Sequence, residues 1–252
     1  MRDRSRSWSV VAEGVHRLDV AHVNCYLVVR PDGMTLVDAG LPGTWGALRD
    51  VLGHLRATPA DIDAVVLTHG HFDHVGIARR LQRAHETAVH VHARDRRLAR
   101  HPYLYRPERA RPPYLARYPK ALPVLGDMVL HGALGVRGVT ARASLANGHP
   151  LDVPGSPVPL WTPGHTDGHC ALLFDDIGIL FSGDAIVTLD PYTAETGPRL
   201  VANAATADSR AALASLDALA QVEAPLMLPG HGEPWRDGVR AAARLARAAG
   251  AR

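Results

Sequence analysis

The segment Thr68-His69-Gly70-His71-Phe72-Asp73-His74 decides how this chain is interpreted, because it places three histidines and an aspartate within six residues. The apolar run 64–67 before it predicts a buried strand, and residues 75–81 after it predict the first turns of a helix. We therefore expect the four side chains on a loop between a strand and a helix, where they can converge on one point. Imidazole and carboxylate ligands together suit zinc, iron or manganese, whereas calcium and magnesium prefer oxygen ligands alone.

The same pattern recurs downstream, where three more apolar strands end in Gly164-His165, Gly183-Asp184 and Gly230-His231. Glycine lets the backbone turn sharply or approach a neighbour closely at a strand end. A lone histidine in such a place is more often structural, but four occurrences of one pattern are hard to attribute to chance. A single metal site needs three or four protein ligands, so seven candidates suffice for two adjacent metals that share a carboxylate. The candidates are His69, His71, Asp73, His74, His165, Asp184 and His231.

The remaining pattern predicts strands and helices that alternate in two halves, each rich in strands. Residues 24–29 and 34–40 form a predicted hairpin across a Pro-Asp-Gly turn, and residues 44–56 form a predicted helix. Such a pattern favours sheets packed together and covered by helices. No long linker interrupts the chain, so we predict one domain over residues 1–252, with an insertion at about 101–138.

The insertion differs in composition from the rest, since it combines prolines and arginines with Tyr103, Tyr105, Tyr114 and Tyr118. One interpretation is a surface connector whose tyrosines pack on the core. The other is a lid or substrate wall, because aromatic rings with polar tips bind ligands well. Tyr192 is a further candidate for such a wall.

Composition excludes several classes of protein. The apolar fraction of 46% and the net charge of +3 are ordinary for a globular protein, and no polybasic block or nucleic-acid-binding module is present. The first residues are charged but lack the apolar run of a signal peptide, and no stretch approaches a membrane span. We expect a cytoplasmic location, a small-molecule substrate, and no nucleic-acid or membrane partner; the oligomeric state cannot be read. Cys25 and Cys170 are expected to be reduced thiols, with one disulfide as the alternative.

The ordered motifs T-H-x-H-x-D-H, T-P-G-H, S-G-D and P-G-H resemble those of the metallo-beta-lactamase superfamily, in particular its glyoxalase-II-like and lactonase-like hydrolases. The resemblance covers residues 24–232. It implies an α/β fold, an αββα sandwich of two mixed β-sheets flanked by helices, with metals in a cleft at one sheet edge. It also implies that Asp38 supports the site by orienting a ligand histidine, although a turn before Gly40 would explain this aspartate as well.

The resemblance assigns the candidate ligands to two sites. It implies one metal at His69, His71 and His165, a second metal at Asp73, His74 and His231, and a bridge at Asp184. Beta-lactamases of the superfamily lack this bridging aspartate, so the resemblance argues against antibiotic hydrolysis. Only 21 residues follow His231, so we expect no glutathione-binding helical domain. Val187 stands where acyl-homoserine lactonases have a tyrosine.

These observations predict a metal-dependent hydrolase that binds two divalent metal ions, with Zn²⁺ as the first choice and Mn²⁺ or Fe²⁺ as alternatives. A hydroxide held between the metals would attack an ester, lactone or thioester carbonyl, with Asp73 as the catalytic residue that orients it and transfers a proton. One alternative is a persulfide dioxygenase with a single iron on His71, His165 and Asp184. The other is a metal-stabilised binding scaffold without catalysis.

Overall fold

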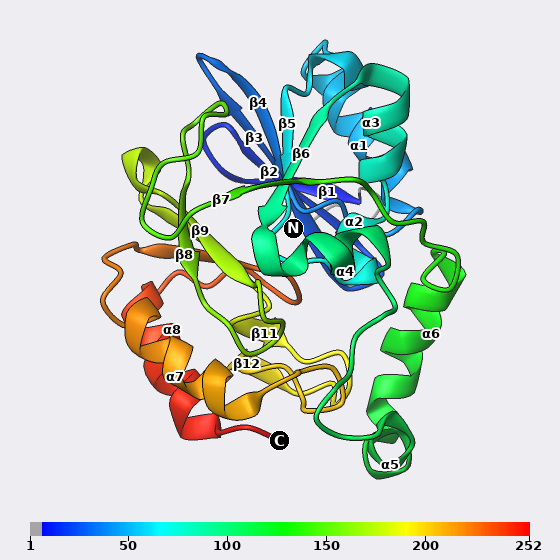
Figure 1. Ribbon diagram of the computed structural model, residues 1–252, viewed down its shortest axis with the longest axis vertical. Helices are drawn as coiled ribbons and strands as arrows, with labels where there is room; N and C mark the ends of the chain where they lie inside the picture. The colour runs from blue at the N-terminus through cyan, green and yellow to red at the C-terminus, as the bar shows by residue number, and fades with distance from the viewer. Residues whose placement is uncertain (1–6) are drawn as a thin grey trace.

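Two β-sheets face each other at the centre of the computed structural model, which describes residues 7–252 (Figure 1). In the first sheet the seven strands lie in chain order: β1 (Trp8–Ala12), β2 (Val15–Val20), β3 (Val23–Arg30), β4 (Gly33–Val37), β5 (Ala64–Val66), β6 (Ala88–His92) and β7 (Arg142–Leu145). The second sheet has the order β13 (Leu226–Pro229), β10 (Ile179–Gly183), β9 (Cys170–Phe174) and β8 (Val158–Trp161). Both sheets are mixed, because β4 to β7 run parallel to one another and β10 runs parallel to β13, while the other pairs are antiparallel.

Helices cover the outer face of each sheet, and a short hairpin lies beside the second one. The helices are α1 (Thr44–His54), α2 (Phe72–Val75), α3 (Ala78–His85), α4 (Arg96–Arg100), α5 (Arg111–Arg117), α6 (Leu122–Leu130), α7 (Ser209–Leu219) and α8 (Val239–Ala249). Short 3₁₀ turns occur at Pro59–Asp61, Ala93–Asp95, Pro119–Ala121 and Asp175–Ile177. The hairpin consists of β11 (Val187–Leu189) and β12 (Thr196–Arg199).

The alternation of side chains along β3 shows how the layers are built. Cys25 and Leu27 pack in the apolar cluster that includes helices α1 and α3, whereas Tyr26 and Val28 pack toward the second sheet. Successive side chains of a strand point to opposite faces, so one apolar run serves both layers. The ring of Tyr26 meets Phe181 of β10 edge-on, with ring centroids 5.2 Å apart.

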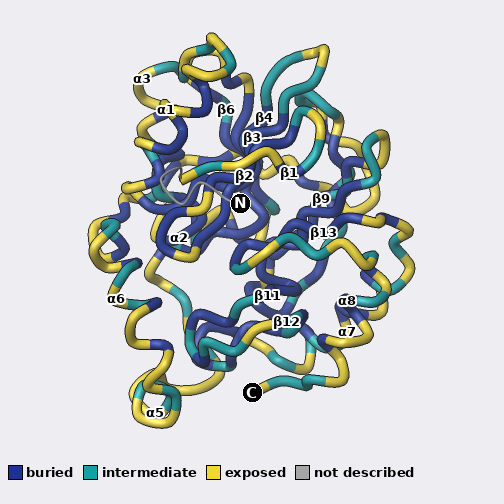
Figure 2. Tube along the Cα trace, turned by 180° about the vertical axis from the view of Figure 1, so that it is seen from behind, coloured by how far each residue is buried: buried dark blue, intermediate teal, exposed yellow. Residues whose placement is uncertain are grey.

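The second sheet repeats this arrangement in mirror order. Phe181 faces the first sheet, while Leu180 beside it packs on Leu216 of α7 and Ala242 of α8. Figure 2 shows the result: the central strands are buried, and the exposed positions lie mainly on the outer turns of the helices and on the connecting loops. The four layers confirm the predicted αββα sandwich of two mixed sheets.

The segment after β5 differs from its prediction, whereas the cysteines agree with theirs. Helix α2 starts earlier than predicted, at Phe72, and already contains Asp73 and His74. It then breaks, because the backbone N–H groups of Gly76 and Ile77 donate to the carbonyls of Gly40 and Ala39 instead of continuing the helix. The prediction for the cysteines is confirmed, as Cys25 and Cys170 are both buried and free.

Residues 101–138 form the extended side of the molecule that carries α5 and α6 (Figure 1). Within residues 7–252, no helix is long and apolar enough to cross a membrane.

Candidate metal centre

The seven candidate ligands come together at one edge of the sandwich, although they are spread over more than 160 residues of the chain. His69 and His71 follow β5, and α2 supplies Asp73 and His74. The others follow strands of the second sheet: His165 follows β8, Asp184 follows β10 and His231 follows β13. All seven are buried, with exposed fractions of 7% or less.

The ligand atoms fall into two groups of three with Asp184 between them. His69, His71 and His165 form one group, and Asp73, His74 and His231 form the other; within each group the ligand atoms lie within 4.8 Å of one another. The carboxylate of Asp184 faces both groups, since its Oδ2 lies 3.4 Å from His165 Nε2 and 3.3 Å from His231 Nε2. Its Oδ1 lies 3.6 Å from His74 Nε2.

Several of these atoms have no partner among the described residues, which is the condition a metal would satisfy. Four atoms, His69 Nε2, His71 Nε2, His74 Nε2 and Asp184 Oδ1, are buried and make no hydrogen bond within residues 7–252. An unpaired buried polar atom costs roughly 1–3 kcal/mol, and four in one place would be costly in a protein that binds nothing there. The mixture of imidazole and carboxylate groups fits a borderline metal such as zinc.

The ring orientation of two of these histidines is fixed by hydrogen bonds that they donate to Asp38 and Thr68. Asp38 Oδ2 lies 3.0 Å from His74 Nδ1, and Asp38 also accepts hydrogen bonds from the backbone N–H and hydroxyl of Thr68. The hydroxyl of Thr68 therefore accepts from His69 Nδ1, 3.0 Å away. Because both histidines donate from Nδ1, their Nε2 atoms are left as acceptors for a metal. Asp38 lies at a positive φ of 57°, which an aspartate tolerates better than most residues.

His165 and His231 are oriented in the same manner by groups from other segments. His165 Nδ1 lies 3.4 Å from the hydroxyl of Thr206, which itself donates to a backbone carbonyl. His231 Nδ1 lies 2.8 Å from the carbonyl oxygen of His22. In both cases Nε2 is the atom that faces Asp184.

The protonation of the cluster follows from its charges. Burial lowers the pKa of His74, but the carboxylates of Asp184, Asp38 and Asp73 outweigh it and raise that pKa to about 9. The pKa of His231 is raised well above its usual value for the same reason, against the effect of burial. Burial raises the pKa of Asp73, yet the two neighbouring histidines bring it down to about 2. Asp73 is thus ionised at neutral pH.

The histidines of the other group behave in the opposite way. Burial lowers the pKa of His69 and His71 well below the usual value, and lowers that of His165 to about 4 despite Asp184. These rings are neutral at pH 7, which is the form that binds a metal.

Asp95 is a functional residue that the sequence pattern does not reveal. It accepts three hydrogen bonds, from the backbone N–H groups of Gly70 and Gly168 and from the hydroxyl of Thr166. It thereby ties the segment that carries His71 to the segment that carries His165. Its neighbours in the sequence are arginines, so nothing in the local pattern distinguishes it from a surface aspartate.

His169 is a second residue of this kind. Its Nε2 accepts the backbone N–H of Asp184 at 3.0 Å, and its Nδ1 lies 2.8 Å from the hydroxyl of Thr162. Burial lowers the pKa of His169 to about 3, so the ring stays neutral. The sequence does contain a signal, because His169 lies only four residues after the candidate ligand His165. Its role, however, depends on its contact with Asp184 at the end of β10, which the local sequence does not show.

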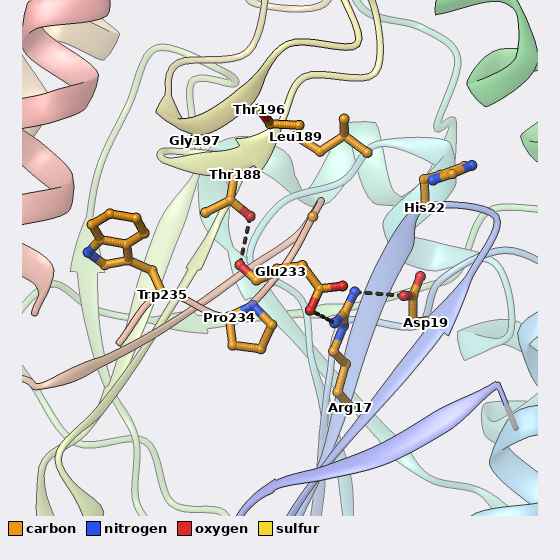
Figure 3. Close-up of a pocket in the computed structure, with 11 residues that line it drawn as sticks. Arg17, Asp19, His22, Thr188, Leu189, Thr196, Gly197, Glu233, Pro234 and Trp235 are labelled. Carbon is orange, nitrogen blue, oxygen red and sulfur yellow. Dashed lines mark hydrogen bonds and ion pairs between the residues drawn. The ribbon is translucent and has the colours of Figure 1, made fainter. Parts of the chain in front are cut away.

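The segment of His231 is held from the opposite side by β2 and β3. The side-chain amide of Asn24 donates to the carbonyls of Pro229 and Gly232, and its oxygen accepts from Arg17. Figure 3 shows this buried Arg17, which also pairs with Asp19 and with Glu233. The cavity in that figure, about 330 Å³, shares no lining residue with the ligand cluster, and the charge of its Arg17 is already balanced.

At two of the ligand motifs, a side chain in place of the glycine would collide with neighbouring atoms. A side chain at Gly230 would place its Cβ 2.2 Å from Asp184 Oδ1, so only glycine lets β13 approach the cluster. Gly164 has a φ of +135°, and a Cβ there would lie 2.1 Å from the backbone nitrogen of Ala212 in α7.

A small cavity lies directly over the ligand atoms, and two of the five tyrosine candidates line it. Its other walls are apolar side chains such as Leu125 and Met128 together with the ligands themselves. Tyr105 packs its ring on His71, with centroids 3.9 Å apart, and Tyr192 lies beside it. The space that remains, about 20 Å³, admits one or two water molecules.

The other three tyrosines are placed elsewhere. Tyr103 stacks on Phe72 and its hydroxyl bonds to the backbone of Ala133 and Val136. Tyr114 and Tyr118 line a separate surface depression together with Arg117. The structure therefore brings only Tyr105 and Tyr192 to the cavity over the ligands.

Comparison with known proteins gives consistent results. The family model of the metallo-beta-lactamase superfamily matches residues 18–231. The chain is 30% identical over 249 residues to the probable metallo-hydrolase YflN of Bacillus subtilis, an alignment that covers 92% of this chain and 88% of that protein. The crystal structure of the metallo-beta-lactamase family protein TTHA1429 from Thermus thermophilus superposes with a TM-score of 0.69 at 28% identity, covering 95% of this chain and 80% of that one. The structure of TTHA1623 in a di-iron-bound form has a TM-score of 0.58 at 26% identity and covers 87% and 92%.

Proposed function

Because the chain belongs to the metallo-beta-lactamase superfamily, we propose that it uses two divalent metal ions to hydrolyse an ester, lactone or thioester bond. Metal-dependent hydrolysis as such is supported by the family, by the probable metallo-hydrolase relatives and by the His/Asp cluster. The choice of bond and the number of metals are our inference.

One observation carries the proposal for two metals. Asp184 lies between two groups of three ligands, and its oxygens are within 3.6 Å of a nitrogen from either group. A single metal would use one group and leave the other three buried ligands without a function. The di-iron form of TTHA1623 supports a pair of metals in a similar fold, and leaves iron beside zinc as a candidate.

The residues that would hold the metals are His69, His71 and His165 for one ion, Asp73, His74 and His231 for the other, and Asp184 for both. A divalent metal held there would polarise a carbonyl oxygen and would make a nucleophile available from water at neutral pH.

The chain itself contributes orientation, exclusion of water and proton transfer. Asp73 is ionised and buried, and it lines the cavity over the ligands, so its carboxylate can orient an attacking water and accept its proton. The same proton can then pass to the leaving group. The narrow cavity limits the number of water molecules beside the ligands, which strengthens electrostatic interactions there.

The test combines metal content with activity. Protein purified without chelator or added metal is analysed by elemental mass spectrometry, and is then assayed with panels of esters, lactones and thioesters. About two zinc, manganese or iron ions per chain with hydrolysis would support the proposal. One iron ion per chain, together with oxygen uptake in the presence of a persulfide, would instead support the dioxygenase alternative. Bound metal without turnover of any substrate would support the non-catalytic binding scaffold.

A further inference from the structure

Positive charge is concentrated in one part of the chain, which the small net charge conceals. Residues 94–120 contain nine basic and two acidic residues and so carry +7, whereas the whole chain carries +3 and the remainder therefore −4. No continuous polybasic run marks this stretch, because the cations are separated by prolines, tyrosines and alanines. The basic residues are Arg94, Arg96, Arg97, Arg100, Arg106, Arg109, Arg111, Arg117 and Lys120.

Three of these arginines line an open groove that reaches the metal-ligand cluster. The groove has a volume of about 360 Å³ and is lined by Arg94, Arg97 and Arg106. His71 and His165 form its inner end, and both of them also line the narrow cavity over the ligands. The groove is thus an outer extension of the candidate active site.

Tyr105 separates the two spaces. It lines both of them, its ring packs on His71, and its hydroxyl accepts a hydrogen bond from Arg111. A molecule that occupied the groove would therefore place one end against His71 and His165 and the other end among the arginines.

The groove presents more positive than negative charge to a ligand. Its acidic residues are Asp95, whose oxygens already accept three hydrogen bonds, and Asp167. Arg94 is held over the ring of Trp161 at 4.8 Å, and within residues 7–252 no carboxylate pairs with Arg94, Arg97 or Arg106. This differs from Arg17 in the cavity of Figure 3, which is neutralised by two acids.

We propose that this groove binds an anionic group, a carboxylate or a phosphate, of the substrate whose reacting bond lies at the cluster. The proposal rests on the proposed hydrolase function and specifies its substrate class. The planar guanidinium group can donate two hydrogen bonds to a pair of oxygens of a carboxylate or a phosphate, and such charge-assisted hydrogen bonds are about twice as strong as neutral ones. A groove of this size suits a small molecule, since ligand pockets are typically about 300–1,000 Å³.

The first experiment compares substrates that share a reacting bond and differ by one anionic group. S-butyryl pantetheine and S-butyryl 4′-phosphopantetheine present the same thioester without and with a phosphate, and p-nitrophenyl butyrate and mono-p-nitrophenyl glutarate differ by a carboxylate. We expect the metal-loaded enzyme to prefer the charged member of at least one pair by about tenfold or more in kcat/KM, mainly through KM. The pair that shows the preference tells phosphate from carboxylate.

The second step removes the cations. In the double variant Arg97→Glu/Arg106→Glu, the ratio of kcat/KM between charged and neutral substrates should fall to about one. Arg244→Glu, an exposed arginine on α8, makes the same type of charge change away from the groove and should keep the wild-type ratio. Salt should lower the ratio in the wild type, because exposed charges are screened. Circular dichroism and metal content of each variant exclude unfolding and metal loss.

The outcomes separate this inference from the proposed function. Hydrolysis with equal kcat/KM for charged and neutral members of both pairs would overturn the anionic-group assignment and leave the hydrolase intact. If no substrate were turned over, calorimetry with glutarate and with adenosine 3′,5′-bisphosphate would test the groove directly. Binding that is lost in the double variant but kept in Arg244→Glu would support the assignment, and binding unaffected by the double variant, or absent, would overturn it. Tighter binding of a single-stranded oligonucleotide than of the bisphosphate would replace the small molecule by a nucleic acid.

Discussion

Four of the five histidines in the cluster use one ring nitrogen for the protein and leave the other facing the ligand space. His69 and His74 do so through Thr68 and Asp38, while His165 and His231 use a hydroxyl and a backbone carbonyl. Their orientation is therefore set before any metal binds, which lowers the entropy lost on binding. We therefore expect that replacing a single atom in one of these orienting groups lowers the affinity of the site for metal.

Asp73→Asn tests the catalytic assignment, because asparagine keeps the shape of the side chain but cannot accept a proton. We expect kcat to fall by about 100-fold or more while the protein stays folded. Steady-state kinetics and circular dichroism measure both quantities, and Asp152→Asn on an exposed loop serves as the control. Turnover near that of the wild type would refute the assignment. Metal content must be measured in parallel, since Asp73 is also a candidate ligand.

His169 is expected to act as a positioning residue through the backbone of Asp184. His169→Leu removes the acceptor of the Asp184 N–H and should weaken metal affinity by roughly 10–100-fold. His169→Gln can still accept that N–H and donate to Thr162, so it should recover much of the affinity. Competition with a chromogenic chelator gives the affinities. If the leucine and glutamine variants bound metal equally, a positioning role through this hydrogen bond would be excluded.

The residues that a sequence can reveal are those with an unusual side chain at an unusual spacing. The ligands were accessible for this reason, since packing alone seldom requires a histidine beside a glycine at the end of a strand. Asp95, Asn24 and Thr206 were not, because their importance lies in which distant groups they contact: backbone groups for Asp95 and Asn24, and the ring of His165 for Thr206. The five tyrosine candidates could not be told apart, as all lie in segments without a regular period.

Among the elements, the turn between β2 and β3 is a short connection with a direct link to the cluster. Ala21 and His22 both have positive φ, 54° and 64°, and the carbonyl of His22 accepts the hydrogen bond from His231. A left-handed backbone costs about 1–2 kcal/mol for a residue with a Cβ. The turn therefore stores conformational strain next to a candidate ligand.

Replacement of His22 by glycine should relieve part of this strain without removing the carbonyl. We expect His22→Gly to raise the free energy of unfolding by about 1 kcal/mol and the Tm by roughly 2–4 °C. The lost contact with Asp127, 3.7 Å away and exposed, contributes little. Glu13→Gly, in the β1–β2 turn at a residue without positive φ, should instead lower the Tm. Thermal unfolding that showed the same loss for both variants would contradict this account.

The elements themselves were predictable where an apolar period continued to a clear turn, as in β3, β4 and α1. The prediction was inaccurate where tertiary contacts decide the backbone. Helix α2 begins at Phe72 and ends after one turn. The backbone N–H groups of Gly76 and Ile77, which a longer helix would use, donate instead to carbonyl oxygens in the loop before Leu41. In the β11–β12 hairpin, Val187 and Thr188 of β11 favour a strand, but β12 contains Gly197 and Pro198, which do not.

For the molecule as a whole, the protonated histidines make the metal-free protein sensitive to alkaline pH. The pKa of His74 is raised to about 9 in the fold, against 6.5 for the usual value, and the pKa of His231 is raised as well. A raised pKa stabilises the fold fully below pH 6.5, and this stabilisation is lost as the pH rises toward 9. The lowered pKa values, such as about 4 for His165, affect stability only below pH 6.5.

The free energy of unfolding of the metal-free protein should therefore fall between pH 7 and 8.5. We expect a loss of about 2 kcal/mol for each histidine that stays protonated in the fold but is neutral in the unfolded chain, or roughly 4–8 °C in Tm. Metal-loaded protein should change little over this range, because the metals replace those protons. Scanning calorimetry of chelator-treated, dialysed protein beside reloaded protein measures the difference. A pH-independent Tm in the metal-free protein would show that these histidines are neutral in the fold.

The division of the ligands between the two sheets has a consequence for the integrity of the chain. Residues 7–149 hold the first sheet with His69, His71, Asp73 and His74, and residues 150–252 hold the second sheet with His165, Asp184 and His231. A break between His149 and Pro150, both exposed, would separate the ligands into two incomplete sets. Metal bound at the proposed site would then act as a cross-link, because each group of candidate ligands includes side chains from both fragments. Co-expressed fragments should reassemble in the presence of zinc and come apart with a chelator, so this fold is suited to a metal-gated split-protein reporter.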